Sequence, residues 1–221
     1  MSQEILVNVM PHETRIAVLE QGIVEELHVE RPSTRGVVGN IYWGKVSRVL
    51  PGMQSAFIDI GMERAAFLHV ADLYENRADE NAERTPIEKM IREGQTLMVK
   101  AIKDPVGSKG ARLSSQLSLA GRFLVYLPQD AHIGISQKIE DEAERDRLRE
   151  QMQNIVTSLN VSGGFIVRTV AEGATEEEIR ADVEYLTRVW NEILTRGMEL
   201  SAPALLYQDL RLQQRMLRDI A

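Results

Sequence analysis

The sequence predicts an α+β protein of several domains, and three observations lead to that prediction. Short β-rich runs separated by turn residues fill residues 4–118, which is typical of small β units. After residue 118 the pattern changes to strands mixed with amphipathic helices. The length of 221 residues suffices for one large domain or two to three small ones with a buried core.

Residues 4–30 contain three β-rich runs, which predict an antiparallel meander. Pro11 and Gly22 mark the turns between the runs. The expected strands are residues 4–9, 14–19 and 24–29. Because three strands alone make a poor domain, we expect the meander to pack with a segment further along the chain.

Residues 38–118 read as a second and denser β unit with five expected strands. A polar and charged excursion, residues 74–94, separates the third strand from the fourth, and residues 86–92 within it predict a short helix or mobile loop. Five strands with an excursion after the third fit an OB-type barrel. The expected strands are residues 41–50, 55–60, 65–70, 96–102 and 111–117.

From residue 119 the pattern predicts an α/β unit. Residues 122–128 and 163–169 read as strands, with a highly charged helix over 142–159 between them. Thr175 and Glu178 have the spacing of a capping box, which predicts that a second amphipathic helix begins there. We expect that helix to stop at Gly197.

A last amphipathic helix is expected to start at Pro203. It would carry its apolar side chains on one face, and it reaches Ala221 without a residue that ends a helix. We therefore expect the chain to be a fragment of a longer protein. The face would hold Leu206, Leu210, Leu217 and Ile220.

Composition and charge exclude several classes of protein. The absence of cysteine excludes disulfides and thiolate metal ligands in this chain and favours a reducing cytoplasm. No apolar run approaches the ~18 residues of a membrane span, and the start lacks the pattern of a signal peptide. The net charge of −7 excludes a polycation that binds nucleic acid by charge alone. Residues 38–118, with 11 basic and 10 acidic side chains, could still present a modest basic face.

Several strings, in this order, resemble the N-terminal half of the ribonuclease E/G family. The resemblance runs from residue 4 to at least 169 and is specific, because both order and spacing match. The strings are LVNV (6–9) with ETRIA (13–17), GNIYWGKV (39–46), VLPGMQSAFIDIG (49–61), AFLH (66–69), GSKGARL (107–113) and GFIVRT (164–169).

The resemblance implies an arrangement of subdomains. Residues 1–37 would begin an RNase H-like subdomain, and residues 38–118 would be an OB-fold RNA-binding domain inserted into it. Residues 119–205 would form a 5′-sensor subdomain, and residues 206–221 would start the returning RNase H-like segment. In the family, a DNase I-like domain with an Asp pair for catalytic Mg²⁺ follows, and then a Cys-x-x-Cys zinc link; neither is expected in this chain.

The resemblance also implies a function. The chain would bind RNA and sense a 5′-monophosphate for a single-strand-specific, Mg²⁺-dependent endoribonuclease, a cytoplasmic homo-oligomer acting in rRNA processing and mRNA decay. By itself it would hold no cofactor and cut nothing. The alternative is a complete, non-catalytic OB-fold protein such as a translation or ribosome-assembly factor, which a native mass near that of this chain would favour. A weaker alternative is a protein-binding scaffold that uses the acidic helices of residues 140–196.

Phe57 and Phe67 are the leading candidates for RNA contact on the barrel. An exposed aromatic ring can stack on a base for ~1–3 kcal/mol, but apolar neighbours on both sides of Phe57 leave a core position open. The resemblance favours RNA contact for both rings. Lys109, in a glycine-flanked hairpin tip, could approach a phosphate closely. Weaker candidates for the same face are Lys45, Lys103 and Arg112.

Arg168 and Thr169 end an expected strand, and a guanidinium beside a hydroxyl suits a terminal monophosphate. The dipeptide alone proves nothing, but both positions match residues of the family that bind the RNA 5′-monophosphate. Gly121 and Val125 match positions that shape that pocket and stack on the terminal nucleotide. Nearby, Gln137 and Lys138 stand where ribonuclease E has two Arg residues, so only the second charge is kept.

The remaining acidic and histidine residues do not predict a metal site. Clustered carboxylates are needed for a metal nuclease, and no pair here has a convincing spacing. The carboxylates considered are Asp59, Asp72 and Asp104. The histidines, expected to be structural or exposed, are His12, His28, His69 and His132.

Overall fold

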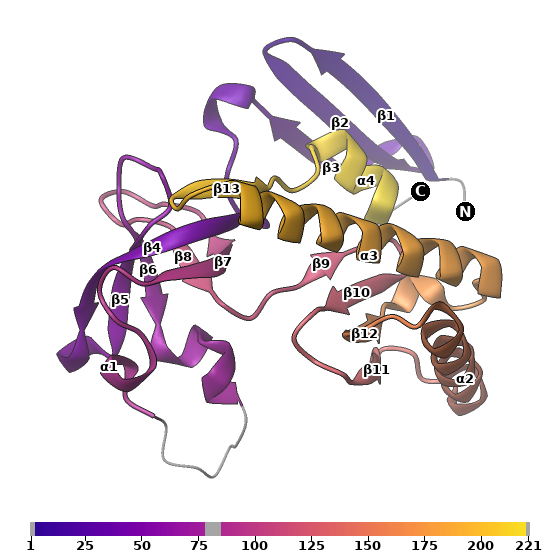
Figure 1. The fold of residues 1–221 in the computed structure, drawn as a ribbon. Helices are drawn as coiled ribbons and strands as arrows, with labels where there is room; N and C mark the ends of the chain where they lie inside the picture. The colour runs from indigo at the N-terminus through magenta and orange to yellow at the C-terminus, as the bar shows by residue number, and fades with distance from the viewer. Residues whose placement is uncertain (1–2, 78–84, 220–221) are drawn as a thin grey trace. The chain divides into compact units, whose positions relative to one another are not determined.

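The computed structural model describes residues 3–77 and 85–219 (Figure 1). The chain divides into two compact units, residues 1–37 with 209–221, and residues 38–208. The middle of the predicted polar excursion, residues 78–84, lies outside the described residues, and so does Ile220.

The first unit begins with the predicted meander, which the structure confirms. Strands β1 (Gln3–Met10), β2 (Glu13–Glu20) and β3 (Ile23–Glu30) pair antiparallel in the order β1-β2-β3. The turn between β2 and β3 places Gln21 and Gly22 at positive φ, 52° and 80°. Two consecutive residues of this kind make a tight hairpin that matches the twist of its strands.

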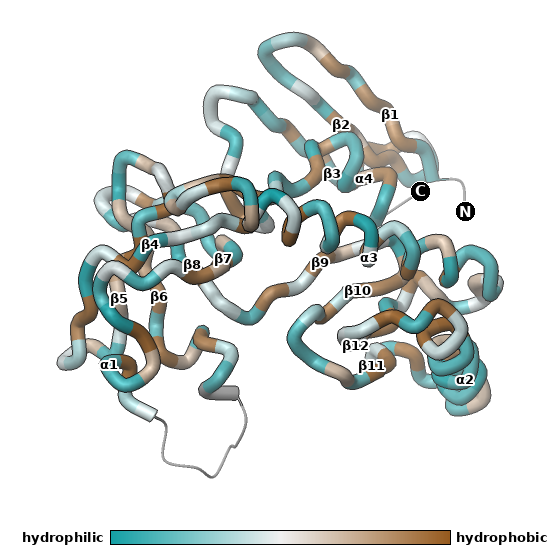
Figure 2. The backbone as a smooth tube through the Cα atoms, viewed as in Figure 1, coloured by the Kyte–Doolittle hydropathy of each residue, from teal (hydrophilic) through white to brown (hydrophobic). Residues whose placement is uncertain are grey.

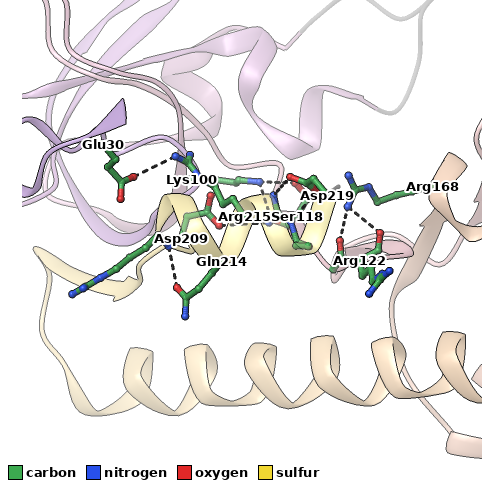
Figure 3. A network of polar contacts seen from close by, with 12 residues as sticks. Glu30, Lys100, Ser118, Arg122, Arg168, Asp209, Gln214, Arg215 and Asp219 are labelled. Atoms are coloured by element: carbon green, nitrogen blue, oxygen red, sulfur yellow. Dashed lines mark hydrogen bonds and ion pairs between the residues drawn. The ribbon is translucent and has the colours of Figure 1, made fainter. Parts of the chain in front are cut away.

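Helix α4 (Leu212–Asp219) completes the first unit, so the meander does pack with a later segment. Leu212 and Met216 pack with Ile16 and Val18 in one apolar cluster. The Glu30 carboxylate accepts a hydrogen bond from the Leu212 N–H at 3.2 Å. It also accepts one from the Arg215 guanidinium at 3.3 Å (Figure 3). This pair of contacts ties the end of β3 to the first turns of α4.

The second unit contains a closed five-stranded barrel, as predicted. Its order is β4-β5-β6-β8-β7, and β4 pairs with β7 to close it. Strands β6 and β8 are parallel, while the other barrel pairs are antiparallel. This arrangement is compatible with an OB fold. The strands are β4 (Ile41–Leu50), β5 (Ser55–Asp59), β6 (Ala66–His69), β7 (Thr96–Lys103) and β8 (Arg112–Ser114).

Alternation along these strands fills the barrel with small and branched apolar side chains. Ala56, Ile58, Leu68, Val99 and Leu113 are fully buried. The excursion returns through a single helical turn, α1 (Ile87–Met90), which buries Ile87. That turn lies within the segment predicted to form a short helix.

A four-stranded sheet follows the barrel in the order β11-β12-β10-β9. Only β11 and β12 are parallel; the other pairs are antiparallel. The sequence did not predict β9 or β11, which are too short to give a periodic signal. The strands are β9 (Leu119–Ala120), β10 (Leu124–Leu127), β11 (Ile133–Ile135) and β12 (Gly164–Val167).

Helices α2 (Glu142–Leu159) and α3 (Glu176–Glu199) pack on this sheet (Figure 1). The bounds of α2 agree with the prediction, and the helix is largely hydrophilic (Figure 2). It buries only Leu148, Met152 and Ile155. The capping box of α3 is confirmed, because Thr175 accepts the Glu178 N–H and Glu178 accepts the Thr175 N–H.

The predicted stop of α3 at Gly197 is wrong, since the helix continues to Glu199. A Cβ at Gly197 would lie 3.7 Å from Leu206 and 3.8 Å from Met98. The glycine therefore lies where the helix packs against neighbouring segments. Close packing therefore explains the glycine at this position, and a left-handed residue that ends the helix does not.

The last segment corrects a second prediction. Residues 203–221 do not form one helix: β13 (Ala204–Tyr207) pairs with β4 at Ile41–Trp43, and α4 begins only at Leu212. Leu206 enters the core of the second unit, whereas Leu217 is 58% exposed. The edge of β4 offers backbone partners that a sequence reading cannot see.

No helix among the described residues is both long and apolar enough to cross a membrane. The assignment of these segments to RNase H-like and 5′-sensor subdomains stays a prediction.

Candidate nucleic-acid interface

Phe57 and Phe67 lie directly opposite each other on β5 and β6. Their ring centroids are 6.3 Å apart, and the planes meet at 67°, an edge-to-face pair. The neighbours Ile58 and Leu68 are fully buried, and Phe57 is 36% exposed. The two rings therefore lie on the outer face of the barrel and do not belong to its core.

Strand register extends this pair into a row across the barrel. Phe57 lies opposite Arg48 on β4, and Phe67 lies opposite Arg112 on β8, which in turn pairs with Lys103 on β7. Directly opposed residues project from the same face of a sheet. The row therefore places cationic side chains on both sides of two aromatic rings.

A groove of about 820 Å³ opens over this row. Four of its twelve lining residues are basic and one is acidic, so the local charge is positive although the whole chain carries −7. The lining residues are Met53, Phe57, Arg64, Ala65, Phe67, Lys103, Asp104, Val106, Ser108, Lys109, Gly110 and Arg112.

The hairpin tip that carries Lys109 is held against the barrel. The backbone N–H and C=O groups of Val106 and Lys109 pair at 3.2 and 3.0 Å, with Gly107 at φ 57° between them. A Cβ at Gly110 would lie 2.0 Å from the carbonyl oxygen of Ala65, so only glycine allows this approach. Arg64 also donates to the Gly107 carbonyl.

Of the weaker candidates, Arg112 lines the groove and Lys45 does not. The Arg112 guanidinium pairs with Asp72 at 2.8 and 2.9 Å, so its charge is largely balanced within the protein. Lys45 is exposed, but it lies opposite Asp59 and does not line the groove. Lys103 and Lys109 are both exposed and line the groove.

Several groove or row residues were not found from the sequence. Met53 and Val106 are 63% and 73% exposed at the groove, and Arg48 and Arg64 add cations. Only register reveals Arg48, because a bulge between Val46 and Arg48 shifts which residue meets Phe57. The hairpin contact that brings Arg64 to the groove joins residues 43 positions apart.

A second site lies at the end of β12, where the structure brings Arg168 to Gly121. The Arg168 guanidinium donates to the carbonyls of Gly121 at 2.7 Å and Arg122 at 3.0 Å (Figure 3). Its backbone N–H binds the Phe123 carbonyl at 2.8 Å. These contacts hold a half-buried guanidinium beside the turn at residues 121–124.

Asp182 of α3 holds that turn from the other side. Its carboxylate accepts the backbone N–H groups of Arg122, Phe123 and Leu124 at 3.2, 2.9 and 2.9 Å. Burial raises the pKa of the Asp182 carboxyl above its ordinary value, while the three N–H groups oppose that shift. The sequence held a signal for this residue, since Asp182 stands within the apolar stripe of Ile179, Val183 and Leu186.

Thr169 lies next to a hydroxyl that the sequence reading did not single out. The Ser136 and Thr169 hydroxyl oxygens are 3.4 Å apart, and Lys138 is exposed two residues beyond Ser136. Arg145 of α2 donates to the carbonyls of Ser136 and Ile139 at 2.8 and 3.0 Å. The loop with Ser136 is therefore anchored to α2, while Gln137 beside it is exposed.

The loop after Thr169 is anchored to the same helix. Glu144 accepts the Gly173 N–H at 2.9 Å and pairs with Arg147, which also donates to the Ala174 carbonyl at 3.1 Å. The hydrogen bond from Arg147 and that from Gly173 lower the pKa of Glu144 to about 2. Both loops beside Thr169 thus depend on the first turns of α2.

Val125 lies on the sheet face away from the helices. It pairs across the sheet with Ile166 on one side and Ala120 on the other, and it is half-buried. Its apolar surface, beside the 37% exposed Ile166, could support a nucleotide base.

The carboxylates considered for a metal have other partners. Asp59 accepts the Gly61 N–H, Asp104 accepts the Val38 N–H, and Asp72 pairs with Arg112. In residues 3–77 and 85–219 no group of three or more His, Asp or Glu side chains could hold an ion. His28 pairs with Glu26, His69 accepts the Ala71 N–H, and His12 and His132 are exposed.

A closed five-stranded barrel whose outer face carries aromatic rings among cations is an arrangement that OB-type proteins use to bind single-stranded nucleic acid. Comparison with known proteins gives the family. The model of the ribonuclease E/G family matches residues 118–221. Ribonuclease G of Haemophilus influenzae is 48% identical over 222 residues, covering 98% of this chain and 45% of the relative.

Further relatives agree with this result. Ribonuclease G of Escherichia coli K12 is 47% identical over 227 residues, covering 100% of this chain and 46% of the relative. Ribonuclease E of Nostoc sp. is 37% identical over 206 residues, covering 92% of this chain and 29% of the relative. The chain belongs to the ribonuclease E/G family. It spans about half the length of the ribonuclease G relatives it matches.

Proposed function

We propose that this chain binds single-stranded RNA through the groove on the barrel. The observation that carries the proposal is the Phe57–Phe67 pair, which lies on the outer face of the barrel and lines the same groove as Lys103 and Lys109. Rings of this kind stack on bases with little sequence preference, while the lysines contact phosphates. The competing function, a protein-binding scaffold on the acidic helices, would leave this groove without a role.

Substitution of the rings tests the proposal. Phe57→Ala and Phe67→Ala should each weaken binding of a single-stranded oligoribonucleotide by ~1–3 kcal/mol, measured by fluorescence anisotropy. Tyr185→Ala is the matched control, because Tyr185 is also an aromatic side chain with 36% exposure but lies on α3. Unchanged affinity in folded Phe variants would contradict the assignment of the groove.

The second part of the proposal is recognition of a 5′-monophosphate at Arg168 and Thr169. It is supported by the guanidinium held beside Gly121 and by the paired hydroxyls of Ser136 and Thr169. A terminal phosphate would gain charge-assisted hydrogen bonds that a 5′-hydroxyl cannot make, each worth roughly 1.5–3 kcal/mol before desolvation. The base would lie on Val125.

Matched oligonucleotides with a 5′-phosphate and a 5′-hydroxyl test this site. The phosphate-ended strand should bind about tenfold tighter, since part of the hydrogen-bond energy is spent on desolvation. Arg168→Ala should bring the two dissociation constants together. A preference that survives in Arg168→Ala would move the site elsewhere.

The longer protein is proposed to be a cytoplasmic, homo-oligomeric endoribonuclease of rRNA processing and mRNA decay. Its Mg²⁺ and structural Zn²⁺ would be held outside this chain, since the described residues contain no group of three or more His, Asp or Glu side chains that could hold an ion. The chain alone should therefore not cleave an A/U-rich single strand with Mg²⁺. Cleavage that persists through repurification and disappears on mutating one of its acidic residues would contradict this.

A complete, non-catalytic OB-fold RNA-binding protein remains the second candidate. It shares the groove and its rings but gives no reason for a 5′-phosphate preference. Equal binding of the two oligonucleotides would favour it.

A further inference from the structure

Asp182 is a buried carboxylate to which the proposed function gives no role. It is 9% exposed and projects from the apolar face of α3. Its partners are three successive backbone N–H groups of the turn at residues 122–124. A buried carboxylate is costly unless it is well hydrogen-bonded, so its place in the core calls for a physical reason.

The turn is fitted closely around this carboxylate. A Cβ at Gly121 would lie 2.4 Å from both carboxylate oxygens, which only glycine avoids. The Gly121 N–H binds the Leu124 carbonyl at 2.8 Å and closes the turn. The conformation of residues 121–124 thus depends on the position of the Asp182 side chain.

Two peptide groups join Asp182 to Arg168. In the peptide between Gly121 and Arg122, the N–H binds Asp182 and the carbonyl binds the Arg168 guanidinium. In the next peptide, the Phe123 N–H binds Asp182 and the Arg122 carbonyl binds the same guanidinium. A planar trans peptide points its N–H and C=O in opposite directions. The position of the Asp182 carboxylate on one side of each peptide therefore sets the position of the Arg168 guanidinium on the other. Hydrogen bonds in such a chain also polarise one another.

We propose that Asp182 is a positioning residue, which holds the Arg168 guanidinium in place for an RNA 5′-phosphate through the peptides after Gly121 and Arg122. The inference rests on the proposed sensing function. It predicts that removing the Asp182 charge changes phosphate affinity in the direction opposite to the one that simple electrostatics predicts. A negative charge near the pocket repels a phosphate, so its removal alone would strengthen phosphate binding, whereas loss of positioning weakens it.

The Asp182→Asn variant tests the sign of this effect on phosphate binding. The amide is of the same size, but its NH₂ group must face one of the N–H donors, so at least one hydrogen bond of the turn is lost. The ratio of dissociation constants for 5′-hydroxyl and 5′-phosphate strands should fall from about tenfold to below about threefold. Glu184→Gln, an exposed position on the same helix, makes the same change of charge and should keep the ratio.

Gly121→Ala provides a second variant that keeps the charge. Its Cβ would collide with the carboxylate oxygens and displace the turn, so the ratio should fall in the same way. In an Arg168→Ala background, Asp182→Asn should change the ratio no further, because its effect passes through the guanidinium. The Arg168 Nε–H resonance should also shift in Asp182→Asn without RNA.

The outcomes separate the two proposals. Equal dissociation constants in the unsubstituted chain would overturn the sensing function and this inference with it. A discriminating parent whose Asp182→Asn variant keeps or increases the ratio would overturn the positioning role alone. An Arg168 resonance that stays in place would do the same.

Discussion

Individual residues decide whether the hairpin that carries Lys109 can reach the groove. Gly110 passes so near the backbone of Ala65 that a Cβ has no room, and the obstacle is a carbonyl that cannot rotate away. Side-chain flexibility therefore cannot relieve the contact. The placement of Lys109 therefore depends on the absence of a side chain at its neighbour Gly110.

Gly110→Ala should destabilise the barrel by about 1–3 kcal/mol, the usual cost of overpacking, and should weaken binding of single-stranded RNA. Urea unfolding and anisotropy titration measure the two effects. Gly52→Ala is the control, since a Cβ there meets nothing within 4 Å and no positive φ is involved. Equal stability of the two variants would show that the hairpin can move away from β6.

At the scale of elements, α2 supports the proposed 5′ site without forming it. Arg145 anchors the loop at Ser136, and Glu144 with Arg147 anchors the loop at Gly173. The Glu144 side chain is 18% exposed, so solvent screens this ion pair only in part. Both loops should loosen together if the first turns of α2 are disturbed.

Glu144→Gln should lower the free energy of unfolding by about 1 kcal/mol at neutral pH, because the amide cannot replace the charged hydrogen bonds. The pKa of Glu144 is depressed in the folded state from 4.5 to about 2. Its contribution is therefore present above pH 4.5 and is lost as the pH falls through about 2. The difference between parent and variant should shrink across that window.

Asp146→Asn is the matched control for this measurement. Asp146 is 73% exposed on the same helix and pairs with Arg149. Its substitution should change stability by less than about 0.5 kcal/mol. A Glu144→Gln variant that behaves like Asp146→Asn at neutral pH would remove the supporting role of α2.

At the scale of the whole molecule, a net charge of −7 together with a basic groove leads to a specific expectation for how RNA affinity depends on salt concentration. Arg112 is balanced by Asp72, which leaves Arg64, Lys103 and Lys109 as the groove cations that can meet phosphates. Each neutralised phosphate contributes about −0.7 to the slope of log K against log salt for a single strand. The slope should therefore be about −2.

Lys109→Ala should make that slope shallower by about 0.7, while Lys89→Ala, an exposed lysine on α1, should leave it unchanged. Titrations at several salt concentrations give the slopes. A slope much steeper than −2 in the parent would mean that the RNA contacts a wider surface than the groove.

Local signals predicted much of this chain correctly. The span of α2, the capping box at Thr175 and the five barrel strands all follow from periodicity and turn residues within short windows. The predictions were wrong where contacts with a distant segment determine the local structure. Gly197 lies where α3 packs against Leu206, and residues 204–207 became a strand because β4 offered a free edge. The site residues stay predictions, but their exposure is now known.

The sequence by itself determined the family, the three-stranded meander, the five barrel strands, helix α2, the start of helix α3 and the residue types available for RNA. Those properties depend on near neighbours in the chain. Only the tertiary structure placed Phe57 beside Phe67 on the outer face, neutralised Arg112 with Asp72, and brought Asp182 against the turn that holds Arg168. The last two contacts join residues at least 40 positions apart. Such contacts depend on how the strands and helices pack, which no local pattern records.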